Sequence, residues 1–118
     1  MLFLVRHAEP HASPQSPPAA WPLTAAGAAA SARLRETLPP DALLVSSNEV
    51  KAWMTLGRMA DVIRDDRFGE VRRRDDSWLV SREMVNRHGA ADFWEELRFP
   101  DVLRVDLRTP SWDRPHVS

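Results

Sequence analysis

The sequence contains no cysteine, no long apolar run and no excess of charge of either sign. Without cysteine, disulfides, thiolate metal sites and thiol nucleophiles are excluded. The apolar run at residues 2–5 is far too short for a signal peptide or a membrane span. Sixteen basic and seventeen acidic residues leave a formal net charge of −1, which argues against a general binder of nucleic acid or of anionic membranes. Together these features favour a cytoplasmic protein.

The length of 118 residues suffices for one domain with one modest core. Apolar residues make up 43% and charged residues 28%, which is typical of globular proteins rather than of disordered chains. We expect a single domain over residues 1–109. Pro110, Trp112 and Pro115 predict an irregular tail over residues 110–118.

Apolar runs and helix-capping residues alternate along the chain in the order strand, helix, strand, helix. Residues 2–5 have no polar face, which is typical of a strand buried on both sides. Thr24 is a good N-cap for a helix over residues 25–37, and Asn48 for a helix that reaches Ile63. This order predicts an α/β fold with a parallel sheet. Further strands are expected at 43–45, 78–81 and 102–107, the last one half-exposed and antiparallel or at an edge, and a further helix at 90–97.

Arg6 and His7 come directly after the first predicted strand. In open α/β sheets, ligands bind outside the carboxyl ends of the strands. Arg6 offers a planar fork of hydrogen-bond donors, and the imidazole of His7 can be neutral near pH 7. The pair is therefore a candidate phosphoryl-handling site, although an ordinary polar strand exit would have the same two residues.

The stretch Leu4-Val5-Arg6-His7-Ala8-Glu9 resembles the signature of the histidine phosphatase superfamily, the phosphoglycerate-mutase-like proteins. The resemblance implies that His7 is the nucleophile, which becomes a phosphohistidine, and that Arg6 grips the phosphoryl group. It also implies a three-layer sandwich with a mostly parallel central sheet flanked by helices. No metal and no cofactor are required in that chemistry.

Two further stretches agree with the family in the expected order. Leu23-Thr24-x-x-Gly27 is similar to the start of the family's first helix, and residues 46–55 are similar to a block with a serine pair, an arginine, an alanine and a threonine. Gly27 costs roughly 1 kcal/mol of helix propensity relative to alanine. A close approach of its backbone to the sheet would explain this cost, and a tolerated surface glycine is the alternative.

Lys51 stands where the family has a phosphate-binding arginine. A lysine neutralises phosphate as a point charge but cannot form the bidentate fork. The alternative is an exposed helix lysine. His11 lies in the proline-rich loop after the signature, which contacts the substrate phosphate in the resembling family; an exposed loop histidine is the alternative there.

The chain departs from the family in its second half. The strand expected at 78–81 is followed by Arg82 and Glu83, where the family has its second catalytic histidine. Arg82 keeps a positive charge that could bind phosphate. Glu83 and Glu9 are the two candidates for the general acid. His88 is either a displaced substitute for the missing histidine or a residue at a helix end. The chain is also shorter than family members between the second helix and this strand, so the predicted fold is a truncated one.

Two functions follow from this pattern. The first is a phosphatase that hydrolyses a small phosphate monoester through a phosphohistidine on His7. The second is a degenerate, non-catalytic member that binds a phosphorylated ligand, inorganic phosphate or a protein partner in the same crevice. Sheet faces that lack their usual helices would favour a homodimer, and the five tryptophans offer large contact surfaces for it.

Overall fold

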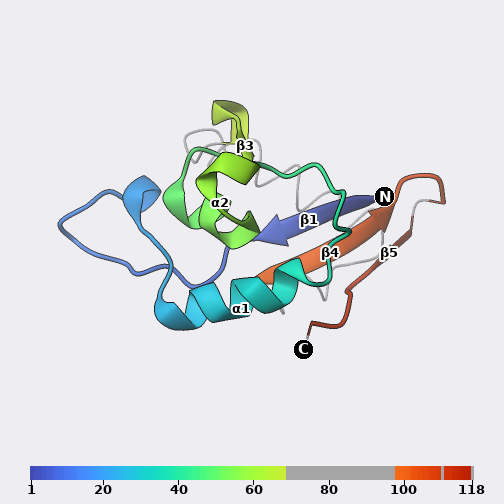
Figure 1. Cartoon of the computed structure of the whole chain (residues 1–118), viewed down its shortest axis with the longest axis horizontal. Coiled ribbons are helices and arrows are strands. Elements are labelled where there is room, and N and C mark those ends of the chain that lie inside the picture. Colours follow the sequence, from blue (N-terminus) through green and yellow to red (C-terminus); the bar gives the residue numbers. More distant parts are fainter. Residues whose placement is uncertain (69–97, 110, 118) are drawn as a thin grey trace.

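The computed structural model describes residues 1–68, 98–109 and 111–117. The strands and helices, shown in Figure 1, are β1 (Leu2–Arg6), α1 (Ala25–Arg35), β2 (Val45–Ser46), α2 (Val50–Leu56), β3 (Ile63–Arg64), β4 (Asp101–Asp106) and β5 (Ser111–Asp113). Three single-turn 3₁₀ helices accompany them, η1 (Pro18–Ala20), η2 (Met59–Asp61) and η3 (Asp66–Phe68). The expected strand at 78–81 and helix at 90–97 lie outside the described residues.

The described strands form two separate sheets. β1, β4 and β5 form an antiparallel sheet in that order, in which Leu2 pairs with Val105 and Arg6 with Asp101. β2 and β3 form a parallel pair of two residues each. The predicted three-layer sandwich with a mostly parallel central sheet is therefore wrong.

This error has a physical cause in β1. Its apolar run predicts a strand buried on both sides, but Leu2 is 36% exposed and the rest of the strand is half-buried. The strand that pairs with it comes from the other end of the sequence, and hydrophobic periodicity carries no information on such a pairing. An apolar run alone does not distinguish parallel from antiparallel neighbours.

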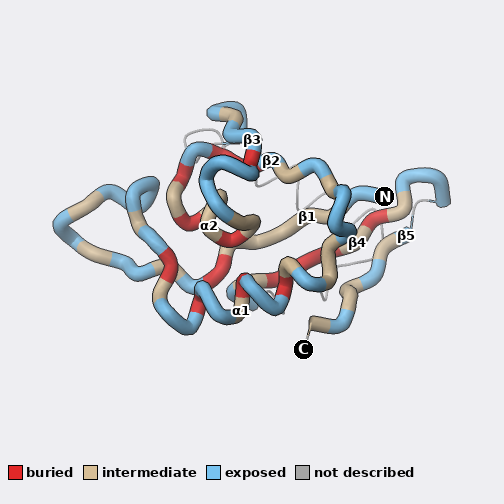
Figure 2. The backbone as a smooth tube through the Cα atoms, in the orientation of Figure 1, coloured by how far each residue is buried: buried red, intermediate tan, exposed pale blue. Residues whose placement is uncertain are grey.

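β4 supplies much of the core. Val102, Leu103 and Val105 are buried, and β4 lies between β1 and β5. Figure 2 shows buried positions along β4, on turns of α1 and at the start of α2. β4 is antiparallel, as its sequence indicated, but it is the central strand of its sheet and not an edge. The expected irregular tail contains β5, which covers the second edge of β4.

α1 begins as predicted. Thr24 is its N-cap, since its hydroxyl oxygen accepts a hydrogen bond from the Gly27 amide at 2.9 Å. Gly27, Ser31 and Leu34 form the buried stripe at the helical spacing. At the last turn, the Arg35 guanidinium donates to the carbonyls of Met54 and Thr55, both at 3.3 Å, and so links α1 to the end of α2.

α2 is much shorter than predicted. It begins after Glu49 rather than after Asn48, and it ends at Gly57, whose φ of +154° favours glycine. The Asn48 amide instead donates to the Asp66 carboxylate. Ile63 lies in β3 and is exposed. The predicted helix was too long because apolar residues continue at helical spacing beyond Gly57. Gly57 is the residue at which the helix stops.

None of the helices within the described ranges is long and apolar enough to cross a bilayer.

Replacing Gly27 with alanine tests the packing of α1. A Cβ on Gly27 would lie 2.5 Å from the backbone oxygen of Glu9, so a main-chain shift is required. We expect Gly27→Ala to lower the free energy of unfolding by about 1–3 kcal/mol, despite its better helix propensity. The exposed Ala29→Gly is the matched control and should cost about 1 kcal/mol. A stabilising Gly27→Ala in urea unfolding would contradict the close packing.

The ion pair between β4 and β5 predicts an acid-sensitive strand. The Arg104 guanidinium lies opposite Asp113, donates to its Oδ1 at 2.8 Å and lowers the pKa of that carboxyl below its ordinary value of 3.8. A lowered pKa contributes stability above pH 3.8 that is lost as pH falls through the lowered value. We expect the protection of the β5 amides against hydrogen exchange, relative to the intrinsic rate at each pH, to fall below about pH 4, more than that of the β1 amides.

The control for this prediction is Asp113→Asn. The amide cannot titrate, so β5 in this variant should exchange faster at neutral pH and show no further acid step in this range. Both residues are solvent-exposed, and the effect on global stability should be small. Identical pH profiles for the two proteins would contradict the assignment.

Candidate functional site

The end of β1 is attached to α2 through one buried hydroxyl. The amide of Ala8, which follows His7, donates to Thr55 Oγ1 at 2.9 Å, and the Thr55 hydroxyl donates to the carbonyl of Lys51 at 2.8 Å. Ala8 and Thr55 are almost fully buried. Lys51 is one turn before Thr55 on α2 and therefore lies on the same helix face. The arrangement brings the end of the family-like stretch 46–55 to the stretch 4–9.

α1 is attached to the next residue, Glu9. The Thr24 amide donates to the Glu9 carbonyl at 3.0 Å, and the Thr24 hydroxyl donates to Glu9 Oε1 at 2.9 Å. Gly27 packs against the same Glu9 backbone, which leaves no room for a Cβ. Gly27 therefore makes a close backbone approach, but to the segment that follows β1 rather than to the sheet itself. The structure thus brings together all three stretches that resemble the family.

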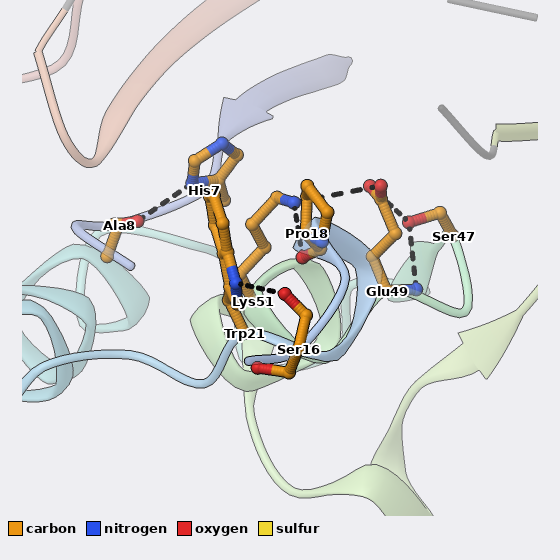
Figure 3. Close-up of polar contacts among 8 residues, drawn as sticks. All are labelled: His7, Ala8, Ser16, Pro18, Trp21, Ser47, Glu49 and Lys51. Atoms are coloured by element: carbon orange, nitrogen blue, oxygen red, sulfur yellow. Dashed lines mark hydrogen bonds and ion pairs between the residues drawn. The ribbon is translucent and has the colours of Figure 1, made fainter. Parts of the chain in front are cut away.

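The imidazole of His7 is held in one tautomer. Its Nδ1 lies 2.8 Å from the carbonyl oxygen of Ala8. A carbonyl oxygen can only accept, so Nδ1 must carry the hydrogen, and in the neutral ring the lone pair is on Nε2. His7 is half-buried, and Figure 3 shows its bond to Ala8. This is the tautomer that a nucleophilic Nε2 requires.

Phe99 adds an aromatic ring to the site. The guanidinium carbon of Arg6 lies 3.7 Å from the centroid of the Phe99 ring, and the His7 ring lies 5.4 Å from it, centroid to centroid. Phe99 reaches this place because Arg6 pairs with Asp101 across the sheet. Sequence reasoning missed it because no motif surrounds it, and only the pairing of β1 with β4 could have indicated it.

Lys51 is buried, with 4% of its surface exposed, so the alternative of an exposed helix lysine is wrong. Its Nζ donates to the carbonyl of Pro18 at 2.9 Å and lies 3.7 Å from Glu49 Oε1. The ammonium also lies 5.6 Å from the Trp21 ring. Figure 3 shows the Lys51 side chain between the loop at Pro18 and the Glu49 carboxylate. In this conformation Lys51 anchors a loop and balances a buried carboxylate.

Glu49 and the loop partners are further residues that the sequence did not single out. The Ser47 hydroxyl donates to Glu49 Oε2 at 3.3 Å and accepts from the Glu49 amide at 3.2 Å, so one residue of the serine pair orients the carboxylate. The Trp21 indole donates to the carbonyls of Ser13 and Ser16, both at 3.1 Å, and closes the loop on itself. A buried Glu–Lys pair at i, i+2 has no sequence signal, because helical pairing rules apply to other spacings.

The remaining predicted site residues differ in their placement. The His11 side chain is exposed at the start of the loop, and its amide donates to the Pro22 carbonyl at 2.7 Å. Arg82, Glu83 and His88 lie outside the described residues. Over 1–68, 98–109 and 111–117, no group of three or more acidic or histidine side chains could hold a metal ion.

A hollow of about 580 Å³ lies elsewhere, between α1 and α2. Its lining includes Leu23, Arg35, Trp53 and Met54 but none of Arg6, His7 and Lys51. The hollow and the candidate site are therefore different parts of the surface.

Comparison of the chain with protein-family models, with curated proteins and with solved structures finds no match.

Removing the ammonium of Lys51 should destabilise the protein through Glu49. Lys51→Met keeps much of the apolar stem but removes the ammonium that lies 3.7 Å from the buried Glu49 carboxylate, and removing one partner of a buried ion pair typically costs about 3–5 kcal/mol. The double variant Glu49→Gln, Lys51→Met should recover at least about 1 kcal/mol, since both charges of the pair are then removed together. Urea unfolding of the two single variants and the double variant measures this coupling. Strictly additive effects would show that the two side chains do not interact.

Proposed function

We propose that the chain is a phosphoryl-transfer enzyme of the histidine phosphatase type, which hydrolyses a small phosphate monoester through a phosphohistidine on His7. The observation that carries the proposal is the convergence of the three family-like stretches on the segment from Arg6 to Glu9. Thr55 binds the Ala8 amide, and Thr24 and Gly27 pack on Glu9. Residues distant in sequence thus support the one stretch that carries the nucleophile.

The chemistry starts from the tautomer of His7. Nε2 attacks phosphorus in line with the leaving oxygen, so that a P–N bond forms as the P–O bond breaks, and the departing oxygen takes up a proton. Water then attacks phosphorus, inorganic phosphate leaves, and the electron pair returns to Nε2. The Nδ1–H bond to the Ala8 carbonyl becomes stronger as the ring gains positive charge.

Arg6 is the phosphate contact in this proposal. Its fork of donors suits the equatorial oxygens of the transferring group, where most of the catalysis of phosphoryl transfer takes place. Lys51 donates to Pro18 and pairs with Glu49, so it would act on phosphate through its field or after displacement of that carbonyl. We keep Glu83 as the proposed general acid and Arg82 and His88 as proposed phosphate contacts.

The engagement of Lys51 also favours the second function, a non-catalytic site for a phosphorylated ligand. With its ammonium held by Pro18 and Glu49, Lys51 contributes less to a transition state than the arginine that it replaces. Losing one preorganised charged donor typically costs on the order of 10²–10³ in rate. Binding of phosphate tolerates such a loss better than turnover does.

Covalent labelling separates the two functions. The protein is incubated with an aryl phosphate, quenched in alkali and assayed for acid-labile phosphate and for release of the phenol. We expect label and turnover in the wild type, both reduced to background in His7→Ala, because that variant has no nucleophile. His116→Ala is the matched control, since it removes an exposed imidazole that is not among the candidate site residues, and it should keep both signals.

Two outcomes would contradict the enzymatic proposal. One is phosphate binding without label or turnover, which would establish the binding function instead. The other is turnover that persists in His7→Ala, which would place the chemistry on another residue.

A further inference from the structure

Phe99 is an exposed aromatic residue at the candidate site. It has 47% of its surface exposed, although its ring contacts two residues that the proposed chemistry uses. A phenylalanine exposed to this degree contributes little to a core. What distinguishes it from the other exposed apolar residues is its contact with Arg6 and His7.

The Arg6 guanidinium contacts this ring through its face. A guanidinium over an aromatic ring is attracted by the negative ring face, while its five N–H donors point outward in the guanidinium plane. At 3.7 Å from the ring centroid, Arg6 is in the range of this stacking. Phe99 can thus fix the plane of the fork without using any of its donors.

The His7 ring is restrained by the same residue. The two ring centroids lie 5.4 Å apart with an interplanar angle of 41°, which is within the range of favourable aromatic pairs. The Nδ1 bond to Ala8 fixes a second direction. The ring contact and the hydrogen bond together define the direction of Nε2.

The segment that carries Phe99 is itself held in place by Asp101. The carboxylate accepts hydrogen bonds from the amides of Arg98 at 3.1 Å and Val102 at 2.9 Å, and it lies 3.2 Å from the Arg114 guanidinium. Asp101 is buried and pairs with Arg6 across the sheet. An exposed ring on an anchored segment is suited to positioning its neighbours.

We infer that Phe99 is a positioning residue, which orients the Arg6 fork and the His7 imidazole toward one bound phosphoryl group. The inference rests on the proposed function for its consequence in catalysis. In-line attack puts the leaving group on the side of phosphorus away from His7 Nε2. Phe99 therefore acts on the phosphoryl group and does not select the leaving group.

The test compares Phe99→Leu, which keeps an apolar side chain but loses the ring face, with Phe99→Tyr, which keeps the face. Phe68→Leu is the matched control, because Phe68 is 59% exposed on η3. The first readout is NMR of the Arg6 Nε–H and the His7 ring protons, which sense the ring current of Phe99. We expect these signals to move in Phe99→Leu and to stay in Phe99→Tyr and Phe68→Leu.

The second readout uses the function. We expect Phe99→Leu to weaken binding of inorganic phosphate about 2- to 10-fold, because an Arg6 side chain that the ring no longer restrains must be immobilised when phosphate binds. It should also lower kcat/KM by the same factor for an aryl and an alkyl phosphate. Phe99→Tyr should restore both quantities. In an Arg6→Ala background, Phe99→Leu should have little further effect on phosphate binding, because Phe99 acts through Arg6.

Each outcome decides a different point. Unchanged NMR signals in Phe99→Leu, or a loss confined to the aryl ester, would overturn the positioning role. A third outcome is that Phe99→Leu changes the NMR signals and the phosphate affinity as expected, while the wild type forms no phosphohistidine. This would end the enzymatic proposal and keep Phe99 as a positioning residue of a binding site. A wild type that does not bind phosphate would overturn both.

Discussion

The candidate site depends on how the two residues after His7 are held between two helices. The Ala8 amide donates to the Thr55 hydroxyl on α2, and the Glu9 carbonyl accepts from the Thr24 amide at the start of α1. The Ala8 amide is thereby satisfied at a buried point, where an unpaired polar group would be costly. Gly27 is required because the helix start and the Glu9 backbone occupy the space of a side chain. The direction in which His7 leaves β1 follows from these contacts.

The sequence was sufficient to predict those features that depend on neighbours in the chain. The Thr24 cap, the start of α1, the first strand and the significance of Gly27 all follow from local rules. The antiparallel pairing of β1 with β4 could not be predicted, because it joins the two ends of the chain. The predicted length of α2 is wrong because apolar residues continue at helical spacing beyond Gly57, where the helix ends.

The candidate site likewise contains residues that the sequence predicts and residues that it does not. Arg6 and His7 could be proposed from the motif, whereas Phe99 depends on the sheet register, and the buried pair of Glu49 with Lys51 has a spacing without a helical pairing signal. Lys51 shows the limit of reading charge from a sequence. Its position in the motif indicated a phosphate ligand, yet its nearest partners are the carbonyl of Pro18 and the carboxylate of Glu49. A buried ammonium requires such partners, because burying an unpaired charge is costly. Lys51 therefore pairs within the protein, and its ammonium is then less available to a ligand.

The antiparallel sheet changes how this site is built. In a parallel sheet, a crevice is lined by the carboxyl ends of neighbouring strands. Here the carboxyl end of β1 meets the amino end of β4, so the residues that precede β4 lie beside Arg6 and His7. Asp101 anchors that segment, and Phe99 is the side chain that it presents. The rule for parallel sheets predicts a site at the carboxyl end of β1, while the aromatic ring beside Arg6 and His7 is a consequence of the antiparallel partner.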